Sequence, residues 1–207
     1  MTRYLFYCIL VALAITLNGC SGKQPQLTID QDSAIPGTSV SRQGNTLPLL
    51  GQGIELGQQI PATHLVDAFT MQAVDLKALR GNVLFLSIVP SIDTKVCEAQ
   101  THLLGENGDA LPPAIRRITI SRDTPFAQKR FAEEAKLTDI QYLSDYKEGT
   151  FGRSTGLLID ASRLLARSVI LVDKEGIVRY IQVVPDISHL PDMDKAFAKA
   201  RELNRMP

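Results

Sequence analysis

The alternation of hydrophobic and polar positions is clearest around one segment, which predicts a buried strand followed by a helix. Residues Val83–Val89, VLFLSIV, are apolar except for Ser87, a pattern typical of a strand that is buried on both faces. Pro90 ends this strand because proline donates no hydrogen bond to a sheet. Residues 91–94 include serine, aspartate and threonine, which favour a helix N-cap, and apolar residues then recur at helical spacing to about Leu111. We therefore expect a tight polar turn between a strand and a helix.

The residues ahead of this segment predict a hairpin and two short elements. Thr46–Gln59 holds two short apolar pieces that are separated by Gly51 and Gly53, which indicates a β-hairpin. His64–Phe69 then predicts a strand, and Val74–Leu79 predicts a short strand or a helical turn. The fold is thus expected to begin with an N-terminal hairpin.

The second half of the chain alternates between strands and helices. Asp123–Leu137 is expected to be a helix with an acidic N-cap and an apolar face that includes Phe126 and Phe131. The other expected elements are strands at Ile115–Ile120, Ile140–Leu143, Arg167–Val172 and Ile177–Val184, a short helix at Phe151–Leu158 and a helix at Asp192–Leu203. This order predicts an α/β fold of the thioredoxin-like type, in which a mixed central sheet is flanked by helices.

The first residues have the pattern of an export signal rather than of a folded domain. Arg3 gives a positive start, and the apolar run Tyr4–Leu17 is shorter than the roughly 18 to 20 residues of a membrane-spanning helix. The run ends in Leu-Asn-Gly-Cys, which resembles the lipobox of bacterial lipoproteins. That resemblance implies cleavage before Cys20 and lipid modification of Cys20; an ordinary secretory signal with a chance cysteine is the alternative.

The domain boundaries follow from this interpretation. Residues 1–19 are expected to be a lipoprotein signal peptide, residues 20–43 a lipidated N-terminus with a flexible polar tether, and residues 44–207 the folded domain. A serine at position 21, directly after the lipidated cysteine, resembles the sequence of lipoproteins that are sorted to the outer membrane. We therefore expect a lipid-anchored protein of the bacterial cell envelope, on the outer membrane and facing the periplasm.

Charge and cysteine content narrow the function classes. The 22 basic and 22 acidic residues cancel without any block of like charge, which argues against nucleic acid as a partner. The three cysteines, Cys8, Cys20 and Cys97, form neither a CxxC pair nor a Cys/His cluster with metal-ligand spacing. A disulfide framework and a zinc site are therefore not expected.

Cys97 has the placement of a reactive residue. It falls in the first turn of the helix predicted after Pro90, where unpaired backbone N–H groups and the helix dipole favour a thiolate over a thiol. A single cysteine at a strand-to-helix junction is, without further context, more often an inert buried residue.

Three segments give that context. Residues 90–97, PSIDTKVC, contain the pattern P-x-x-x-T-x-x-C and resemble the active-site motif of the peroxiredoxins, in particular of their thiol peroxidase branch. Residues 123–131, DTPFAQKRF, and 164–173, LLARSVILVD, are also similar to that branch. The resemblance covers roughly residues 44–204, with the three segments in the family's order.

The resemblance implies a peroxidase site that needs no cofactor or metal. Cys97 would attack a hydroperoxide as a thiolate and become a sulfenic acid. Arg167 would stabilise the thiolate and the charge on the departing oxygen, the Thr94 hydroxyl would hydrogen-bond the peroxide, and Pro90 would shield the pocket. From the residues alone, Arg167 could equally be a surface arginine at a strand end, and Thr94 could be only an N-cap.

One departure from the family pattern concerns recycling. Many thiol peroxidases carry a second, resolving cysteine directly after the Arg-Phe of the second segment, where this chain has Ala132. An external thiol or a reductase partner would then have to reduce the sulfenic acid, and, since related proteins are often dimers, a homodimer is expected. The alternative is a catalytically weak, peroxiredoxin-like binding lipoprotein of the envelope. A thioredoxin-type disulfide oxidoreductase is disfavoured because the chain lacks CxxC.

Overall fold

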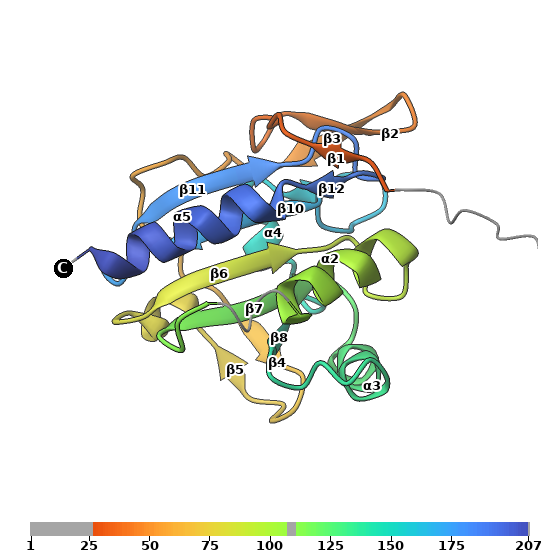
Figure 1. The fold of residues 1–207 in the computed structure, drawn as a ribbon. Helices are drawn as coiled ribbons and strands as arrows, with labels where there is room; N and C mark the ends of the chain where they lie inside the picture. Colours follow the sequence, from red (N-terminus) through yellow and green to blue (C-terminus); the bar gives the residue numbers. More distant parts are fainter. Residues whose placement is uncertain (1–26, 107–110, 207) are drawn as a thin grey trace, which may run out of the picture.

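The computed structural model describes residues 27–106 and 111–206, which form a mixed sheet with helices on both sides. The central sheet has seven strands in the order β11-β10-β6-β7-β8-β4-β5 (Figure 1). These strands are β4 (Leu65–Asp67), β5 (Ala73–Val74), β6 (Val83–Ile88), β7 (Ile115–Ser121), β8 (Gln141–Ser144), β10 (Ser168–Val172) and β11 (Val178–Val183). Strand β7 runs parallel to β6 and β8, whereas the other neighbours are antiparallel. The predicted α/β architecture is confirmed.

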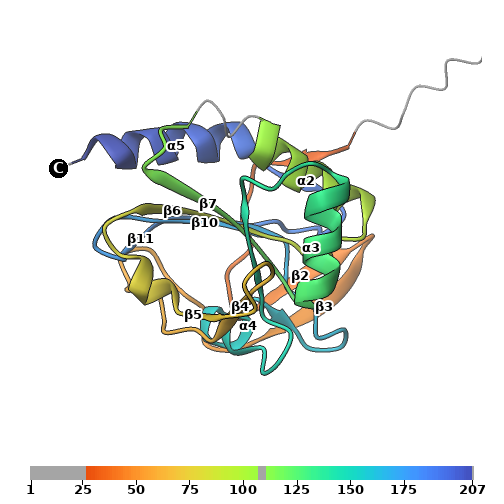
Figure 2. The same cartoon turned by 90° about the horizontal axis from the view of Figure 1, so that it is seen from below.

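The helices cover the two faces of this sheet. They are η1 (Leu76–Leu79), α2 (Lys95–Glu106), α3 (Pro125–Glu134), α4 (Thr150–Thr155) and α5 (Met193–Arg205). Figure 2 shows α2 and α5 on one face, and α4 with the ribbon of β2 (Ser39–Arg42) and β3 (Asn45–Leu50) on the other. The chain therefore has two hydrophobic cores, one on each side of the sheet.

Strand β6 separates these two cores, as its apolar run predicts. Leu86 and Ile88 pack into the core beneath the β2–β3 ribbon, whereas Phe85 and Val89 pack with α2 and α5. The alternation follows from the two-residue period of a strand. Ser87 therefore points toward α2, and this polar position becomes important at the site described below.

The register of the sheet sets which segments meet at the end of β6. Strand β10 is antiparallel to β6, and Ser168, its first residue, pairs with Ile88, the last residue of β6. Arg167 directly precedes Ser168, so it lies beside the loop that leads from β6 into α2. The predicted strand, polar turn and helix are confirmed, with α2 beginning at Lys95.

The N-terminal hairpin exists, but its predicted position is wrong. Its turn is Gln43-Gly44, both with positive φ, between β2 and β3. Gly51 and Gly53 follow the hairpin instead, and a Cβ at Gly51 would meet the carbonyl oxygen of Arg153 at 1.9 Å. These glycines permit a close backbone approach to α4 rather than a turn, two uses of glycine that a sequence pattern does not distinguish. Strand β3 pairs with β2 on one side and with β9 (Leu158–Ile159) on the other.

The predicted tether is wrong for residues 27–43, which belong to the fold. Strand β1 (Ile29–Asp30) pairs in parallel with β12 (Leu190–Pro191), and β2 completes the hairpin. The segment is polar, and hydrogen bonds to distant backbone groups hold it on the domain instead of a large apolar face. The predicted signal peptide and Cys20 lie outside the described residues. Within the described residues, no helix is long and apolar enough to cross a bilayer.

Helix α3 differs from its prediction at its first turn. Its N-cap is Thr124, whose hydroxyl accepts a hydrogen bond from the N–H of Ala127, rather than Asp123. Phe126 is 71% exposed and is not part of the core, whereas Phe131 packs against Tyr142. The released Asp123 carboxylate instead contacts the loop between β6 and α2.

Gly156, at the end of α4, gives a test of how closely this helix packs against the two segments that flank the hairpin. Its φ of +69° is left-handed, and a Cβ there would meet Gly53 Cα at 2.5 Å and Gly37 N at 2.6 Å. Gly57 has a φ of +84° but open space around it, so it is a matched control. We expect Gly57→Ala to lower the free energy of unfolding by about 1 kcal/mol and Gly156→Ala by about 3 kcal/mol, because only the latter adds a steric clash. Urea unfolding measures both, and equal losses would contradict the described packing.

Candidate active site

Cys97 lies in the first turn of α2 with its side chain buried. Its exposed fraction is 0%. The first hydrogen bond of the helix runs from the Glu98 N–H to the Thr94 carbonyl at 2.8 Å, so Thr94 is the N-cap and the N–H groups between them have no acceptor within the helix. The position predicted for Cys97 at a helix N-terminus is therefore confirmed.

Thr94 contacts the sulfur as well as capping the helix. Its hydroxyl donates to Cys97 Sγ over 2.9 Å and also lies 3.3 Å from the Ser91 carbonyl. Thr94 itself is exposed, whereas the sulfur is not. Both of the roles that the sequence left open, a cap and a group at the reacting atom, are compatible with this geometry.

Arg167 is buried beside the sulfur, so its interpretation as a surface arginine is wrong. It is 2% exposed, and its Nη2 lies 3.3 Å from Cys97 Sγ, although the two residues are 70 positions apart. Its Nε donates to the Ile187 carbonyl at 2.9 Å, and its Nη1 donates to Gln100 Oε1 at 2.8 Å. Within the part of the chain that is described, Arg167 forms no ion pair with a carboxylate. A full positive charge is therefore held against the sulfur.

Gln100 holds this arginine and was not identified from the sequence. It lies one helical turn after Cys97 and is fully buried. Its Oε1 accepts from Arg167, while its Nε2 donates to Ser87 Oγ at 2.8 Å. The signal that could have revealed it is a glutamine three positions after the cysteine, on the helix face that meets the single polar residue of a buried strand.

A second group of contacts holds the loop between β6 and α2. Asp123 accepts from the Ser91 hydroxyl at 2.9 Å and from the Ile92 N–H at 2.7 Å. Pro90 is buried at the start of the loop and has no N–H that could compete for the sulfur. The second of the three sequence segments thus fixes the first one in place.

The other residues that the sequence singled out lie apart from this cluster. His102 contacts Glu106 at 2.9 Å and His189 contacts Asp30 at 3.1 Å, so neither is bonded to the sulfur. Ala132 is fully buried in α3. Among the described residues, Cys97 is the one free cysteine.

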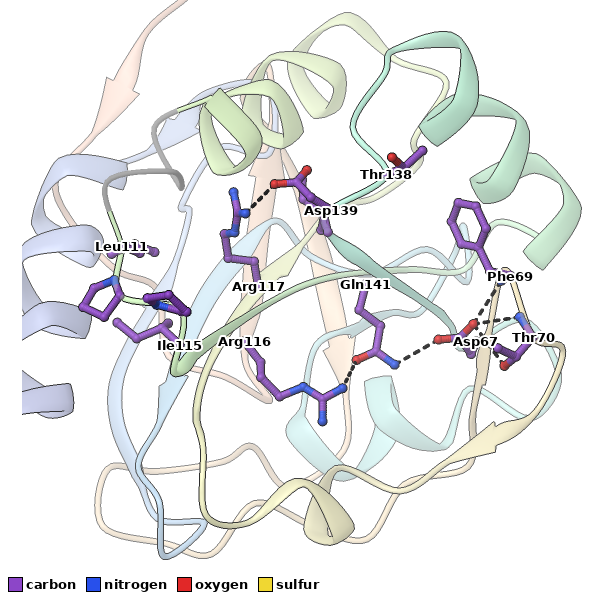
Figure 3. Close-up of a pocket in the computed structure, with 13 residues that line it drawn as sticks. Asp67, Phe69, Thr70, Leu111, Ile115, Arg116, Arg117, Thr138, Asp139 and Gln141 are labelled. Carbon is purple, nitrogen blue, oxygen red and sulfur yellow. Dashed lines mark hydrogen bonds and ion pairs between the residues drawn. The ribbon is translucent and has the colours of Figure 1, made fainter.

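A cavity of about 720 Å³ lies at the other end of the parallel strands, where β7 and β8 begin, and it contains none of the predicted site residues. Figure 3 shows that its polar groups already face one another: Arg116 donates to Gln141, and Gln141 donates to Asp67. Burial raises the pKa of the Asp67 carboxyl, but hydrogen bonds from Gln141, Thr70 and Phe69 outweigh it and place the pKa below its ordinary value. The residues that line the cavity include neither a cysteine nor a histidine.

The cluster around Cys97 suits attack on an electrophile that gains negative charge. The sulfur is in contact with a hydroxyl and a guanidinium, both of which can donate hydrogen bonds to it. The same two donors can also hydrogen-bond a leaving oxygen beside the sulfur. Such an arrangement fits cleavage of an O–O bond by a thiolate better than disulfide exchange, since no second thiol lies among the described residues.

Comparison with known proteins gives the same answer. A model of the Redoxin family matches residues 55–197. The thiol peroxidase of Halalkalibacterium halodurans is 37% identical over 79% of this chain and 97% of that protein, and the thiol peroxidase of Bacillus subtilis is 34% identical over the same shares. The crystal structure of a peroxiredoxin-like protein from Aquifex aeolicus is 31% identical, with a TM-score of 0.76 over 82% of this chain and 99% of that one.

The fold, the cluster of Pro90, Thr94, Cys97 and Arg167, and these matches agree with one another. The predicted family and fold class are confirmed. The chain therefore belongs to the Redoxin family, as a peroxiredoxin of the thiol peroxidase type.

Proposed function

We propose that this thiol peroxidase reduces hydrogen peroxide and organic hydroperoxides in the bacterial cell envelope, with Cys97 as its only redox-active cysteine. The observation that carries the proposal is the pair of contacts on one buried sulfur, from Thr94 at 2.9 Å and from Arg167 at 3.3 Å. A binding lipoprotein without turnover has no chemical need for a buried guanidinium aimed at a thiol.

The reaction follows from this geometry. The Cys97 thiolate attacks the terminal oxygen of the hydroperoxide, so that an S–O bond forms while the O–O bond breaks. The remaining oxygen leaves with the electron pair and takes a proton to become water or an alcohol, and Cys97 becomes a sulfenic acid. Arg167 and Thr94 donate hydrogen bonds to the oxygens as charge moves from sulfur to the leaving group.

Recycling then needs a thiol from outside the fold. Ala132 occupies the position where the resemblance predicts a resolving cysteine, and it is buried in α3. A thiol of a reductant condenses with the sulfenic acid, releases water and leaves a mixed disulfide on Cys97; a second thiol breaks that disulfide and restores Cys97. The reductant is therefore either a small thiol in excess or a dithiol protein.

The envelope location rests on the lipobox-like sequence that ends at Cys20. Acyl chains gain about 0.8 kcal/mol per buried CH₂, so more than one chain on Cys20 holds the protein stably on a membrane. A fully extended chain from Cys20 to Leu27 would span at most about 25 Å. Strand β1 begins at the end of the molecule where α2 begins, which would keep the Cys97 site close to the bilayer (Figures 1 and 2). Lipid hydroperoxides on the outer membrane, reached from the periplasm, are thus substrates of this proposal.

Replacement of the nucleophile gives the first test. We expect Cys97→Ser to abolish thiol-dependent consumption of hydrogen peroxide, because a serine hydroxyl is not ionised at neutral pH. One equivalent of peroxide should add one oxygen atom to Cys97 of the wild-type protein, as measured by mass spectrometry of its peptides. Equal consumption by the two proteins would reject the proposal.

Gln100 gives the second test, because it positions Arg167 without touching the sulfur. Gln100→Met keeps the length of the side chain but leaves Arg167 Nη1 without its acceptor. We expect the second-order rate constant for oxidation of Cys97 by hydrogen peroxide to fall roughly 10- to 100-fold. Alkylation of Cys97 by iodoacetamide, measured at a pH high enough to ionise the thiol in both proteins, has no leaving oxygen for Arg167 to bind and should change much less. A loss of alkylation as large as the loss of peroxidation would contradict a positioning role.

The anchor gives the third test. We expect Cys20→Ala to move the full chain from the membrane fraction to the soluble fraction, because the acyl-bearing residue is lost. Cys8→Ala, which changes a cysteine within the apolar run, is the matched control and should stay with the membrane. Reduction of phospholipid hydroperoxides in vesicles should fall for Cys20→Ala while reduction of hydrogen peroxide stays constant. Unchanged fractionation would reject the lipid anchor and leave the peroxidase activity untouched.

A further inference from the structure

One backbone carbonyl orients Arg167 together with Gln100. Of the three groups that its guanidinium contacts, only the Ile187 carbonyl binds Nε, at 2.9 Å, while Gln100 and Cys97 bind the two terminal nitrogens. An arginine side chain has several rotatable bonds, and the Nε contact selects the rotation of the whole planar fork. Whatever holds the Ile187 peptide in place therefore also positions the group that contacts the sulfur.

Ile187 belongs to a loop, residues 185–190, whose backbone is held by the N-terminal part of the chain. The Ile187 N–H donates to the Ser41 carbonyl at 2.9 Å, while the Ile187 carbonyl accepts from Arg167. Ser41 also donates twice to the Pro185 carbonyl, from its N–H at 2.7 Å and from its hydroxyl at 3.0 Å. Strand β2 is thus bonded directly to this loop.

A second segment, residues 28–34, holds the far end of the loop. The Leu190 N–H donates to the Thr28 carbonyl at 2.7 Å, as part of the β1–β12 pairing. The Asp30 carboxylate contacts His189 Nδ1 at 3.1 Å and accepts from the Asp186 N–H at 3.5 Å, and the Asp30 backbone carbonyl accepts from Gln182 Nε2 at 2.7 Å. Asp30 is therefore the residue of this segment whose side chain bonds to the loop and whose backbone carbonyl bonds to β11.

This segment lies outside the residues 55–197 that the Redoxin model matches. It is polar, short and has Ile29 exposed by 56%, so burial of apolar surface does not account for its place on the domain. Hydrogen bonds hold it instead, some to β11 and others to the loop that carries the Ile187 carbonyl.

We propose that residues 28–34 are a positioning element for the peroxidase site, in which Asp30 fixes the 185–190 loop through His189 and thereby holds Arg167 against Cys97. The proposal rests on the peroxidase function stated above. Without the Asp30 contact, the loop keeps its bonds to β2 but loses side-chain support at its far end. The Ile187 carbonyl then samples other orientations, and the guanidinium spends less time aligned with the sulfur and the leaving oxygen.

The test compares two reactions of Cys97 in the full chain. Asp30→Ala should lower the second-order rate constant with hydrogen peroxide by roughly tenfold, about what weakening one hydrogen bond of a charged group produces. At a pH high enough to ionise the thiol in both proteins, the rate of alkylation by iodoacetamide should stay within about twofold, since alkylation develops no charge on an oxygen that Arg167 would stabilise. The ratio of the two rate constants is therefore the readout, because local unfolding alone would not lower one rate selectively.

Two variants serve as controls. Asp32→Ala removes an exposed carboxylate two residues away. Asp32 is bonded to Gln182 through its backbone carbonyl, which the substitution keeps, so the ratio should stay unchanged. Asp30→Asn keeps an oxygen that can accept from His189 and should recover most of the wild-type ratio. His189→Ala should lower the ratio by no more than Asp30→Ala does, and the double variant should lower it no further than Asp30→Ala, because the contact with His189 is one of two that the Asp30 carboxylate makes with the loop.

An unchanged ratio in Asp30→Ala, an equal fall of both rates, or additive losses in the double variant would overturn the positioning role. A wild-type protein that does not react with peroxide at all would instead reject the proposed peroxidase function, so the two failures are distinguishable.

Discussion

A guanidinium buried against a sulfur atom is the interaction on which the rest of this structure depends. Arg167 is 2% exposed and has no carboxylate partner among the described residues, and an unpaired buried charge is costly. The fold offsets that cost with neutral acceptors, Gln100 Oε1 and the Ile187 carbonyl, which orient the charge without cancelling it. The third group in contact with the guanidinium is the sulfur of Cys97, so the charge is held against the reacting atom.

The sheet topology makes this contact possible between distant segments. Because β10 is antiparallel to β6, the residue that starts β10 lies where β6 ends and where α2 begins. The loop that bears Ile187 follows β11, the neighbour of β10, and so reaches the same end of the sheet. Loops from both halves of the domain thus meet at one sulfur, and Asp123 fixes the loop between β6 and α2.

Local patterns predicted the parts of the fold that local forces determine. The apolar run of β6 and the capped helix α5 were predicted because strand period and N-cap chemistry are visible in a few residues. The structure of residues 27–43 was not predicted, because it is held by hydrogen bonds to distant parts of the chain. Ser41, for example, bonds to the carbonyl of Pro185, which lies 144 positions away. The site divides in the same way: Thr94 and Cys97 share one helical turn, Arg167 required the family resemblance, and Gln100 depends on a contact with Ser87 that only the packed structure reveals.

The most direct measurement of the central claim is the rate at which hydrogen peroxide oxidises Cys97 in an Arg167→Lys variant, followed by stopped-flow. Lysine keeps the positive charge but lacks the planar fork that contacts sulfur, Gln100 and Ile187 together. The account predicts a second-order rate constant at least roughly 100-fold lower than that of the wild-type protein, with the domain still folded by urea unfolding. A folded lysine variant that reacts as fast as the wild type would show that the oriented guanidinium is not what activates Cys97.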